Sequence, residues 1–236
     1  MKYSPVPTMT ACKGRIDSFY HGSALDGEGL RSVVFFSGCN LRCPFCHNPE
    51  TLYGSGSEYT VDEVVKKVLR YKTYYKDGGV TLSGGEPMMQ AEFCAELVDA
   101  LHGEGMNVIA ETNGTVTNEA LIKKLDGVRV DVKNFGGESG ETLVKRYSAF
   151  LSACEKYSTP VTLTNVLIPE VNDGEKAIVA LKELKNAFPF ASGVEFLPFR
   201  KLCVNKYAEL GIKYPYEDKR EATKADVTAA YEKFVK

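Results

Sequence analysis

Three cysteine side chains lie within eight residues of one another, at Cys39, Cys43 and Cys46, directly after the apolar run 33–36. Three thiolates on one loop can converge on one metal centre, and thiolate is the ligand that iron–sulfur clusters and other soft metal sites use. A cluster of the 4Fe–4S type needs four ligands, so three cysteines leave one iron open for a substrate. The spacing therefore favours an iron–sulfur cluster with an open iron as the centre of the chemistry.

The same loop also offers the ligands of a zinc site, because His47 directly follows Cys46 and two further cysteines are near. Structural zinc sites usually draw on two separated ligand pairs, whereas these four residues lie on one loop. Adjacent side chains such as Cys46 and His47 also point apart on most backbones. A zinc-binding interaction module is thus the alternative that is not an enzyme, and the tight spacing disfavours a chance grouping of free cysteines.

The composition is that of a single globular domain. At 236 residues, of which 44% are hydrophobic, the chain can bury a sizeable core. The formal net charge of -2 gives no general electrostatic drive toward nucleic acid or an anionic membrane. Residues 1–10 lack an apolar stretch of signal-peptide length, and no later apolar run approaches the about 18 residues of a membrane span. Seven cysteines are an odd number that fits a secreted disulfide framework badly, so we expect a cytoplasmic protein.

Strand and helix patterns alternate along the chain. Strands are expected at 31–36, 79–82, 107–111, 128–132, 160–167 and 193–197. Helices are expected at 60–75, 88–103, 118–125, 141–157, 175–188 and 223–236. Thr60 and Glu63 form a capping box for the first helix, and a strand or hairpin arm at 13–19 comes earlier.

Six strands alternating with helices predict an α/β fold with a parallel sheet and right-handed crossovers. We expect a partial (β/α)6 barrel of the TIM type rather than a full barrel of eight strands. The barrel would comprise residues 14–200 of a single domain, 1–236, and a C-terminal extension with a helix would comprise 201–236.

Unusual polar residues follow the expected strands one after another. The cysteine loop follows the first strand, and the later strands lead to residues 83–86, 111–114, 131–133, Asn165 and Arg200. Barrel enzymes gather their chemistry at the carboxyl ends of the strands, so these groups are expected to share one site. Gly84 and Gly85 would let the backbone approach a ligand closely.

Asp131 and Lys133 are two residues apart on an expected strand, so their side chains point to the same face. In a barrel mouth each would need a partner, which is either the other residue or a charged ligand. The pattern leaves two interpretations of this pair open, a structural ion pair and a ligand site. The same two interpretations are open for Glu111.

The pattern Cys-x-x-x-Cys-x-aromatic-Cys resembles the signature of the radical S-adenosylmethionine (SAM) enzymes, in which the amino and carboxylate groups of SAM chelate the fourth iron. Segments at 14–19, 26–31, 33–35, 46–50, 80–87, 111–114, 131–133 and 194–199 resemble, in order and spacing, those of the pyruvate formate-lyase activating enzyme family. No second cysteine cluster lies between Cys46 and Ser83, where activases of several other glycyl-radical enzymes insert one. The resemblance covers nearly the whole chain and implies the radical SAM fold.

The resemblance also implies a role for each polar group. Cys39, Cys43 and Cys46 would hold the 4Fe–4S cluster, with Phe45 and His47 beside the cofactor. The contacts to SAM would come from Phe45, Cys46, His47, Gly84, Gly85, Glu86, Asp131, Val132, Lys133 and Arg200. A monovalent cation, Na⁺ or K⁺, would be held by Glu111, Thr112 and the backbone of Arg129.

Three positions depart from the family pattern. Residues 26–29 read Asp-Gly-Glu-Gly where the family usually has aspartate-glycine-proline-glycine. Glu111 stands where the family has an aspartate, one methylene shorter, and Arg200 stands where it usually has a histidine. Arg200 keeps a hydrogen-bond donor and adds a permanent charge.

The activity that the resemblance implies is reductive cleavage of SAM at the open iron. The products would be methionine and a 5′-deoxyadenosyl radical that takes a hydrogen atom from a backbone glycine of a glycyl-radical enzyme. Pyruvate formate-lyase would be the partner, and flavodoxin or ferredoxin the electron donor. Such an oxidoreductase of anaerobic metabolism needs no acid–base triad, in keeping with only three His. Activation of another glycyl-radical enzyme and modification of a peptide are the alternatives among radical SAM reactions.

Overall fold

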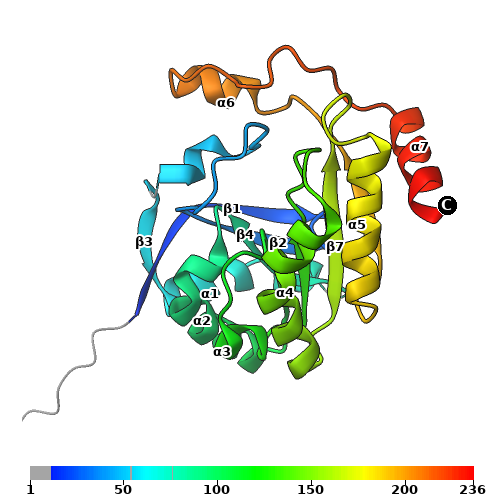
Figure 1. Cartoon of the computed structure of the whole chain (residues 1–236). Coiled ribbons are helices and arrows are strands. Elements are labelled where there is room, and N and C mark those ends of the chain that lie inside the picture. The colour runs from blue at the N-terminus through cyan, green and yellow to red at the C-terminus, as the bar shows by residue number, and fades with distance from the viewer. Residues whose placement is uncertain (1–11, 54, 76) are drawn as a thin grey trace, which may run out of the picture.

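The computed structural model describes residues 12–53, 55–75 and 77–236, and its centre is one sheet of eight strands in the order β3-β1-β2-β4-β5-β6-β7-β8 (Figure 1). Within the described residues, the parallel strands are β2 (Arg31–Phe36), β4 (Gly79–Gly84), β5 (Asn107–Thr112), β6 (Gly127–Asp131), β7 (Val161–Leu167) and β8 (Val194–Pro198). β1 (Lys13–Ser23) runs antiparallel both to β2 and to β3 (Ser57–Thr60). The predicted succession of parallel strands is confirmed.

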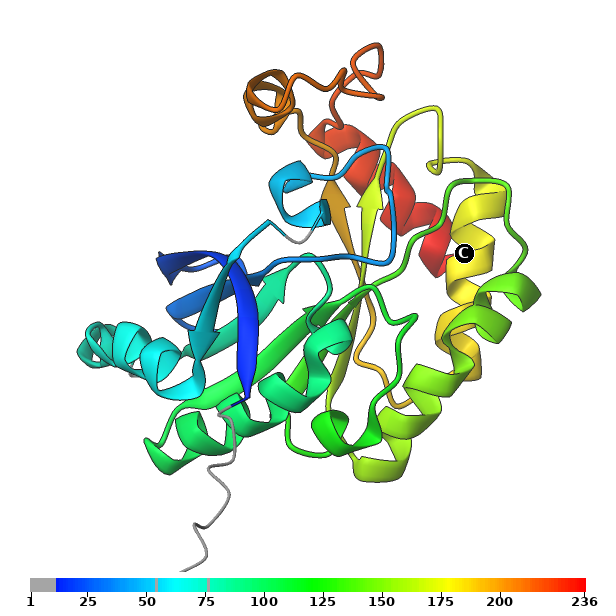
Figure 2. The ribbon, with the colours of Figure 1, turned by 90° about the vertical axis from the view of Figure 1, so that its left-hand side faces the viewer.

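Helices connect the parallel strands and cover the outer face of the curved sheet (Figures 1 and 2). The α-helices are α1 (Val61–Leu69), α2 (Ala91–Gly103), α3 (Glu119–Ile122), α4 (Gly140–Tyr157), α5 (Glu175–Ala187), α6 (Val204–Glu209) and α7 (Lys224–Val235). Short 3-10 helices are η1 (Pro49–Tyr53), η2 (Lys72–Tyr74) and η3 (Pro87–Gln90). The sheet begins with β3 and ends with β8, so among the described strands the barrel is partial and open, as predicted.

Several helices start at local capping residues, and two helices end earlier than the sequence pattern predicted. The Thr60 hydroxyl accepts a hydrogen bond from Glu63 N at 3.4 Å, and the Glu63 carboxylate accepts one from Thr60 N at 2.8 Å, which confirms the capping box. The helix then ends at Leu69, earlier than predicted, where the chain passes into η2. The predicted helix 118–125 shortens in the same way to the single turn α3 after its N-cap, Asn118.

Side chains of the sheet alternate between two environments. Along β5, Val108 and Ala110 are buried beneath the helices, whereas Ile109 and Glu111 are partly exposed toward the barrel interior. The outer face therefore forms the main core, and the inner face is left to line a cavity.

The loop 24–30 packs into the barrel interior. Arg31 is buried at the start of β2 and donates to Thr81 Oγ1 and to Val80 O, each at 2.8 Å. Gly27 has a φ of +125°, and a Cβ there would lie 2.5 Å from Ile109 Cδ1. The loop before β2 is therefore ordered and held against the inner face of the sheet.

The chain after β8 folds over the carboxyl ends of the parallel strands, where α6 lies above the sheet (Figures 1 and 2). We call residues 199–222 the C-terminal segment and residues 38–50 the thiol loop. A second apolar cluster joins them and consists of Phe45, Ile168, Phe199, Cys203, Tyr207, Tyr214 and Ala222. Lys206 Nζ also donates to Asn48 Oδ1 at 2.9 Å and to Glu50 Oε1 at 2.5 Å. The C-terminal segment thus supports the thiol loop from one side.

The final helix, α7, packs beside β8 and α5. Thr223 is its N-cap and forms a capping box with Asp226. Ala230 is buried. Tyr231 is 38% exposed, its ring packs against Phe196, and its hydroxyl accepts a hydrogen bond from Phe196 N at 3.2 Å.

Candidate functional site

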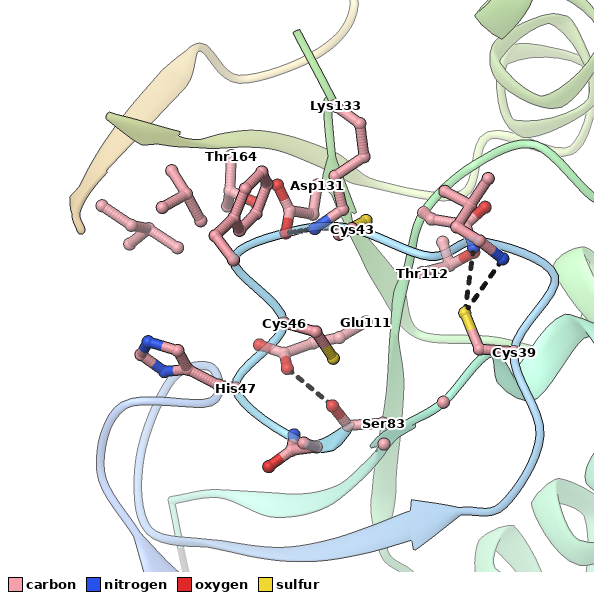
Figure 3. A pocket seen from close by; sticks show the side chains of 18 of the residues that line it. Cys39, Cys43, Cys46, His47, Ser83, Glu111, Thr112, Asp131, Lys133 and Thr164 are labelled. Atoms are coloured by element: carbon pink, nitrogen blue, oxygen red, sulfur yellow. Dashed lines mark hydrogen bonds and ion pairs between the residues drawn. The ribbon is translucent and has the colours of Figure 1, made fainter. Parts of the chain in front are cut away.

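A cavity of about 300 Å³ lies at the carboxyl ends of the parallel strands, between the thiol loop and the inner face of the sheet (Figure 3). The lining includes the thiol loop, the end of β4 and the ends of β5 to β8. The predicted site residues that line it are Cys39, Cys43, Phe45, Cys46, His47, Gly84, Gly85, Glu111, Thr112, Arg129, Asp131 and Lys133. The fold therefore brings together groups that are up to 94 residues apart in sequence, from Cys39 to Lys133.

The three thiols of the loop surround the same space without converging on one point (Figure 3). Cys39 Sγ accepts a hydrogen bond from Leu41 N at 3.4 Å and lies 4.0 Å from Asn113 Nδ2. In residues 12–53, 55–75 and 77–236, no three His, Cys, Asp or Glu side chains are placed to hold a metal ion together. The donor chemistry nevertheless fits a cluster, because three thiols on one loop line one cavity. Binding a cluster requires these side chains to turn toward a common centre.

Burial disfavours the thiolate form of two of these cysteines. It raises the pKa of Cys43, and it raises the pKa of Cys46 to about 11 against the opposing effect of a backbone hydrogen bond at Asn48. Iron binds the thiolate and not the thiol, so loading of this loop must release protons.

His47 is directed away from the thiols. Its Nε2 lies 2.7 Å from the carbonyl oxygen of Arg200, which anchors the ring to the C-terminal segment. Figure 3 shows the imidazole pointing away from the three sulfur atoms. The zinc alternative therefore lacks the fourth ligand that it would take from this residue.

Two glycines let the end of β4 lie against the thiol loop. Gly84 has a φ of +105°, a conformation that side chains with a Cβ rarely adopt. A Cβ on Gly85 would lie 2.1 Å from the carbonyl oxygen of Gly38. That same oxygen accepts a hydrogen bond from Glu86 N at 2.8 Å. The close approach therefore fixes the start of the thiol loop relative to the sheet.

Glu86 was predicted to contact SAM, but the structure buries it completely and it is not among the residues lining the cavity. Its carboxylate accepts hydrogen bonds from Thr112 Oγ1 at 2.7 Å, Asn113 N at 2.8 Å and Met88 N at 3.0 Å. Burial raises its pKa, and these hydrogen bonds oppose that rise. Glu86 thus ties the loop after β5 to the start of η3, directly beneath the cavity.

Charged side chains from β5, from β6 and from the residues directly after β6 form one wall of the cavity. Lys133 pairs with Asp131, and its ammonium lies 5.0 Å from the centre of the Phe45 ring. Burial opposes the charge on Lys133, but Asp131 outweighs it, so the pKa of the lysine lies above its usual value. Burial raises the pKa of Glu111 to about 7, and the nearby Asp26 adds to that rise. Asp131 Oδ1 is buried without a hydrogen bond from the described residues.

Comparison with known proteins identifies the family. The family described as 4Fe-4S single cluster domain matches residues 25–149. The pyruvate formate-lyase-activating enzyme of Clostridium pasteurianum is 34% identical over 232 residues, an alignment that covers 94% of this chain and 97% of that protein. This chain belongs to the pyruvate formate-lyase-activating enzyme family. The enzyme of the same name from Staphylococcus aureus strain USA300 is also 34% identical, with 93% of this chain and 94% of that protein covered.

Solved structures share the fold at low sequence identity. A radical SAM methyltransferase from Sphaerobacter thermophilus superposes with a TM-score of 0.59 at 19% identity over 87% of this chain. Streptococcus suis SuiB bound to precursor peptide SuiA superposes with a TM-score of 0.61 at 13% identity over 85% of this chain. The matches span 63% and 44% of those two proteins. These superpositions show that this chain has the radical SAM fold that the sequence predicted.

Two further residues that the family resemblance associates with SAM do not line the cavity. Val132 is fully buried, and its carbonyl oxygen accepts a hydrogen bond from Asn165 Nδ2 at 2.8 Å. The Arg200 guanidinium donates to Ala222 O at 3.1 Å and lies 3.5 Å from Glu221. Val132 therefore supports the wall from behind, and Arg200 ties the two ends of the C-terminal segment together.

Ser83 and Asn113 also line the cavity and lie in segments 83–86 and 111–114, which were expected to share one site, but neither residue was assigned a role. Ser83 Oγ donates to Glu111 Oε2 at 2.9 Å (Figure 3). Asn113 Nδ2 donates to Asn40 Oδ1 at 2.8 Å. Their position in these two segments was the signal for both residues. Thr164 gave no such signal, because only the register of β7 shows that its side chain reaches the cavity.

Proposed function

We propose that this chain cleaves SAM reductively and uses the radical to take a hydrogen atom from a backbone glycine of pyruvate formate-lyase. One observation supports this most strongly. In a chain 34% identical over 94% of its length to a pyruvate formate-lyase-activating enzyme, the three thiols share a single cavity with the glycine pair and the charged wall.

The proposed cofactors are a 4Fe–4S cluster held by Cys39, Cys43 and Cys46, and SAM. When bound, the cluster would supply the electron that breaks a carbon–sulfur bond of SAM, giving methionine and the 5′-deoxyadenosyl radical. Gly84 and Gly85 would leave room for the methionine end, since neither has a side chain that projects into the cavity. The monovalent cation implied by the resemblance has no support from the comparisons.

The remaining residues would position the cofactor and exclude water. SAM carries both an amine and a carboxylate, so it can interact with both members of the Asp131–Lys133 pair. Phe45 packs against Lys133 and against Tyr216 of the C-terminal segment, with ring centres 6.3 Å apart in the second contact. In this proposal the barrel (14–200) and the extension (201–236) act as one domain, because the apolar cluster that spans them includes the thiol loop.

The proposed partners are a glycyl-radical enzyme as protein substrate and flavodoxin or ferredoxin as electron donor. A glycine inside a folded enzyme must be presented on a segment that can reach this cavity. We place the reaction in the cytoplasm, because thiols awaiting iron require a reducing compartment. No helix within the described ranges is long and apolar enough to span a membrane.

The test uses the full chain, reconstituted anaerobically with iron and sulfide, together with intact pyruvate formate-lyase. Electron paramagnetic resonance should show a glycyl radical doublet that depends on both SAM and reductant. A doublet obtained only with another glycyl-radical enzyme would show that this chain activates that enzyme and not pyruvate formate-lyase. A preparation that takes up zinc, shows no visible iron–sulfur absorbance and cleaves no SAM would overturn the enzymatic proposal itself.

A further inference from the structure

Arg129 projects from β6 into the wall of the cavity and lies between two carboxylates. It stands opposite Glu111 in the parallel register of β5 and β6. Its Nε is 3.2 Å from Glu111 Oε1, and its Nη2 is 2.8 Å from Glu195 Oε2. Only 17% of the Arg129 side chain is exposed to solvent. A permanent positive charge is therefore fixed in the pocket wall, next to the group expected to bind a metal cation.

The side-chain oxygen atoms expected to bind that cation already have partners. Glu111 Oε2 accepts from Ser83 Oγ at 2.9 Å, and Oε1 faces the Arg129 guanidinium. The Thr112 hydroxyl donates to Glu86 at 2.7 Å and accepts from Gly114 N at 3.1 Å. A monovalent cation would have to displace these hydrogen bonds and would also be repelled by the guanidinium. The residues present do not fit a bound Na⁺ or K⁺.

We propose that the Arg129 guanidinium takes the place of the monovalent cation, so that SAM binding by this chain is independent of Na⁺ and K⁺. The inference rests on the proposed function, because it concerns the carboxylate end of SAM in the same cavity. A glutamate at position 111 suits this arrangement, since its longer side chain can meet an arginine on the neighbouring strand. Arg129 is then a binding residue, and its charge does not depend on the ions in the solution.

The test measures SAM affinity directly. The cluster-loaded protein is titrated with SAM by anaerobic calorimetry in sodium, potassium or choline chloride at one ionic strength, choline being too large to enter such a site. The three dissociation constants should agree within about twofold. Binding that is weaker by about tenfold or more in choline would overturn the inference while leaving SAM binding itself intact. Absence of SAM binding in all three salts would overturn both the proposed function and this inference.

Variants separate the charge of Arg129 from its packing. Arg129→Met removes the guanidinium and should make SAM binding about tenfold stronger in potassium than in choline. Arg129→Lys keeps a positive charge, so its SAM affinity should not depend on which salt is present. Arg220→Met is the matched control, because Arg220 also pairs with a carboxylate, Asp226 at 2.8 Å, but lies outside the cavity lining. Iron content and circular dichroism show whether each variant is folded and loaded with the cluster. If Arg129→Met does not fold or load, the comparison of the three salts on the wild-type protein decides the question.

Discussion

Burial alone does not distinguish the cysteines of the thiol loop from those that fill the core. Burial raises the pKa of Cys46 in the cavity and of Cys154 in α4 alike. Their surroundings differ: Cys46 borders open space, whereas Cys94 and Cys154 are fully buried within the main apolar cluster. A thiol at the cavity can reach a metal, and a thiol in the core acts as a small apolar group.

Replacement of cysteines should follow this distinction. Cys39→Ala, Cys43→Ala and Cys46→Ala are each expected to abolish SAM cleavage, because each removes a proposed cluster ligand. Cys94→Ala and Cys154→Ala should retain cleavage and lower the unfolding free energy by about 1 kcal/mol. Cleavage is measured by chromatography of methionine and 5′-deoxyadenosine after reconstitution, and stability by denaturant unfolding. Full cleavage by the Cys43→Ala protein would disprove the ligand assignment.

Asp131→Ala should weaken SAM binding by about tenfold or more while iron and sulfide contents stay unchanged. The carboxylate is the ion-pair partner of Lys133 and lies on β6, outside the loop that carries the thiols. Removing it leaves the lysine charge unbalanced in the cavity wall. Binding is measured by anaerobic calorimetry and the metal by chemical analysis. Loss of iron together with SAM affinity would show that the pair is structural.

Glu111 should make the stability of the protein depend on pH. Burial raises its pKa in the folded state to about 7, from a usual value of 4.5, so at intermediate pH the folded chain holds more protons here than the unfolded chain. The group's contribution is therefore most favourable below pH 4.5 and declines as the pH rises toward 7. Because 27% of the Glu111 side chain is exposed, we expect its ionisation to lower the unfolding free energy by about 2 kcal/mol as the pH rises through this range.

Glu111→Gln should remove this pH dependence, because the amide does not ionise. Denaturant unfolding of both proteins at pH about 5 and about 7.5 measures it, and the other titrating groups cancel in the comparison. Glu195→Gln is the control, since Glu195 also contacts Arg129 but its side chain is 45% exposed. A stability difference between wild type and Glu111→Gln that stays constant with pH contradicts the assignment.

At the level of elements, the sequence predicted the bounds of the parallel strands to within two residues and four of six helix ends to within one, and it placed the ends of α1 and α3 too late. β2 matches its predicted range, 31–36, because an unbroken apolar run in a buried parallel strand is a strong pattern. α1 ended early because tertiary packing, and not periodicity, decides where a helix stops. β3 was missed, since its four residues pair only through β1 and carry no pattern of their own. The cysteines, glycines and charged pair of the site were predictable because they are local motifs.

The cover provided by the C-terminal segment was not predictable from such motifs. Its contacts to the thiol loop join residues far apart in sequence, as between Lys206 and Asn48. The ion pair of Arg129 with Glu111 likewise depends on strand register, which no single strand encodes.

The close approach of β4 to the thiol loop can be tested with one methyl group. Gly85→Ala places a Cβ 2.1 Å from the Gly38 carbonyl oxygen, so the loop must move away from the sheet. We expect the variant to bind markedly less iron and sulfide than wild type after identical reconstitution. Gly103→Ala is the matched control, because a Cβ there meets nothing within 4 Å at the end of α2. Equal cluster loading of both variants would show that the contact does not organise the site.

For the molecule as a whole, the cavity is smaller than its proposed task requires. A volume of about 300 Å³ is at the lower end of the range for ligand sites, so SAM alone would occupy most of it. The glycine of a partner must then be met at the rim of the cavity. Phe135, which is 40% exposed, lies beside the lining residue Phe45, with ring centres 6.0 Å apart. In the proposed function, a partner segment that covers this rim would complete the site for hydrogen abstraction.

SAM cleavage by the isolated chain should therefore be slow, and a short peptide spanning the radical-bearing glycine of pyruvate formate-lyase should accelerate it. Binding of the peptide excludes water and places a hydrogen donor beside the methionine end of the cavity. The same peptide with that glycine replaced by alanine should yield far less peptide radical, because the radical gains stability from the unsubstituted backbone carbon. Chromatography follows 5′-deoxyadenosine, and electron paramagnetic resonance follows the radical. A peptide of scrambled sequence is the control, and equal acceleration by it would mean that the rim does not recognise this partner.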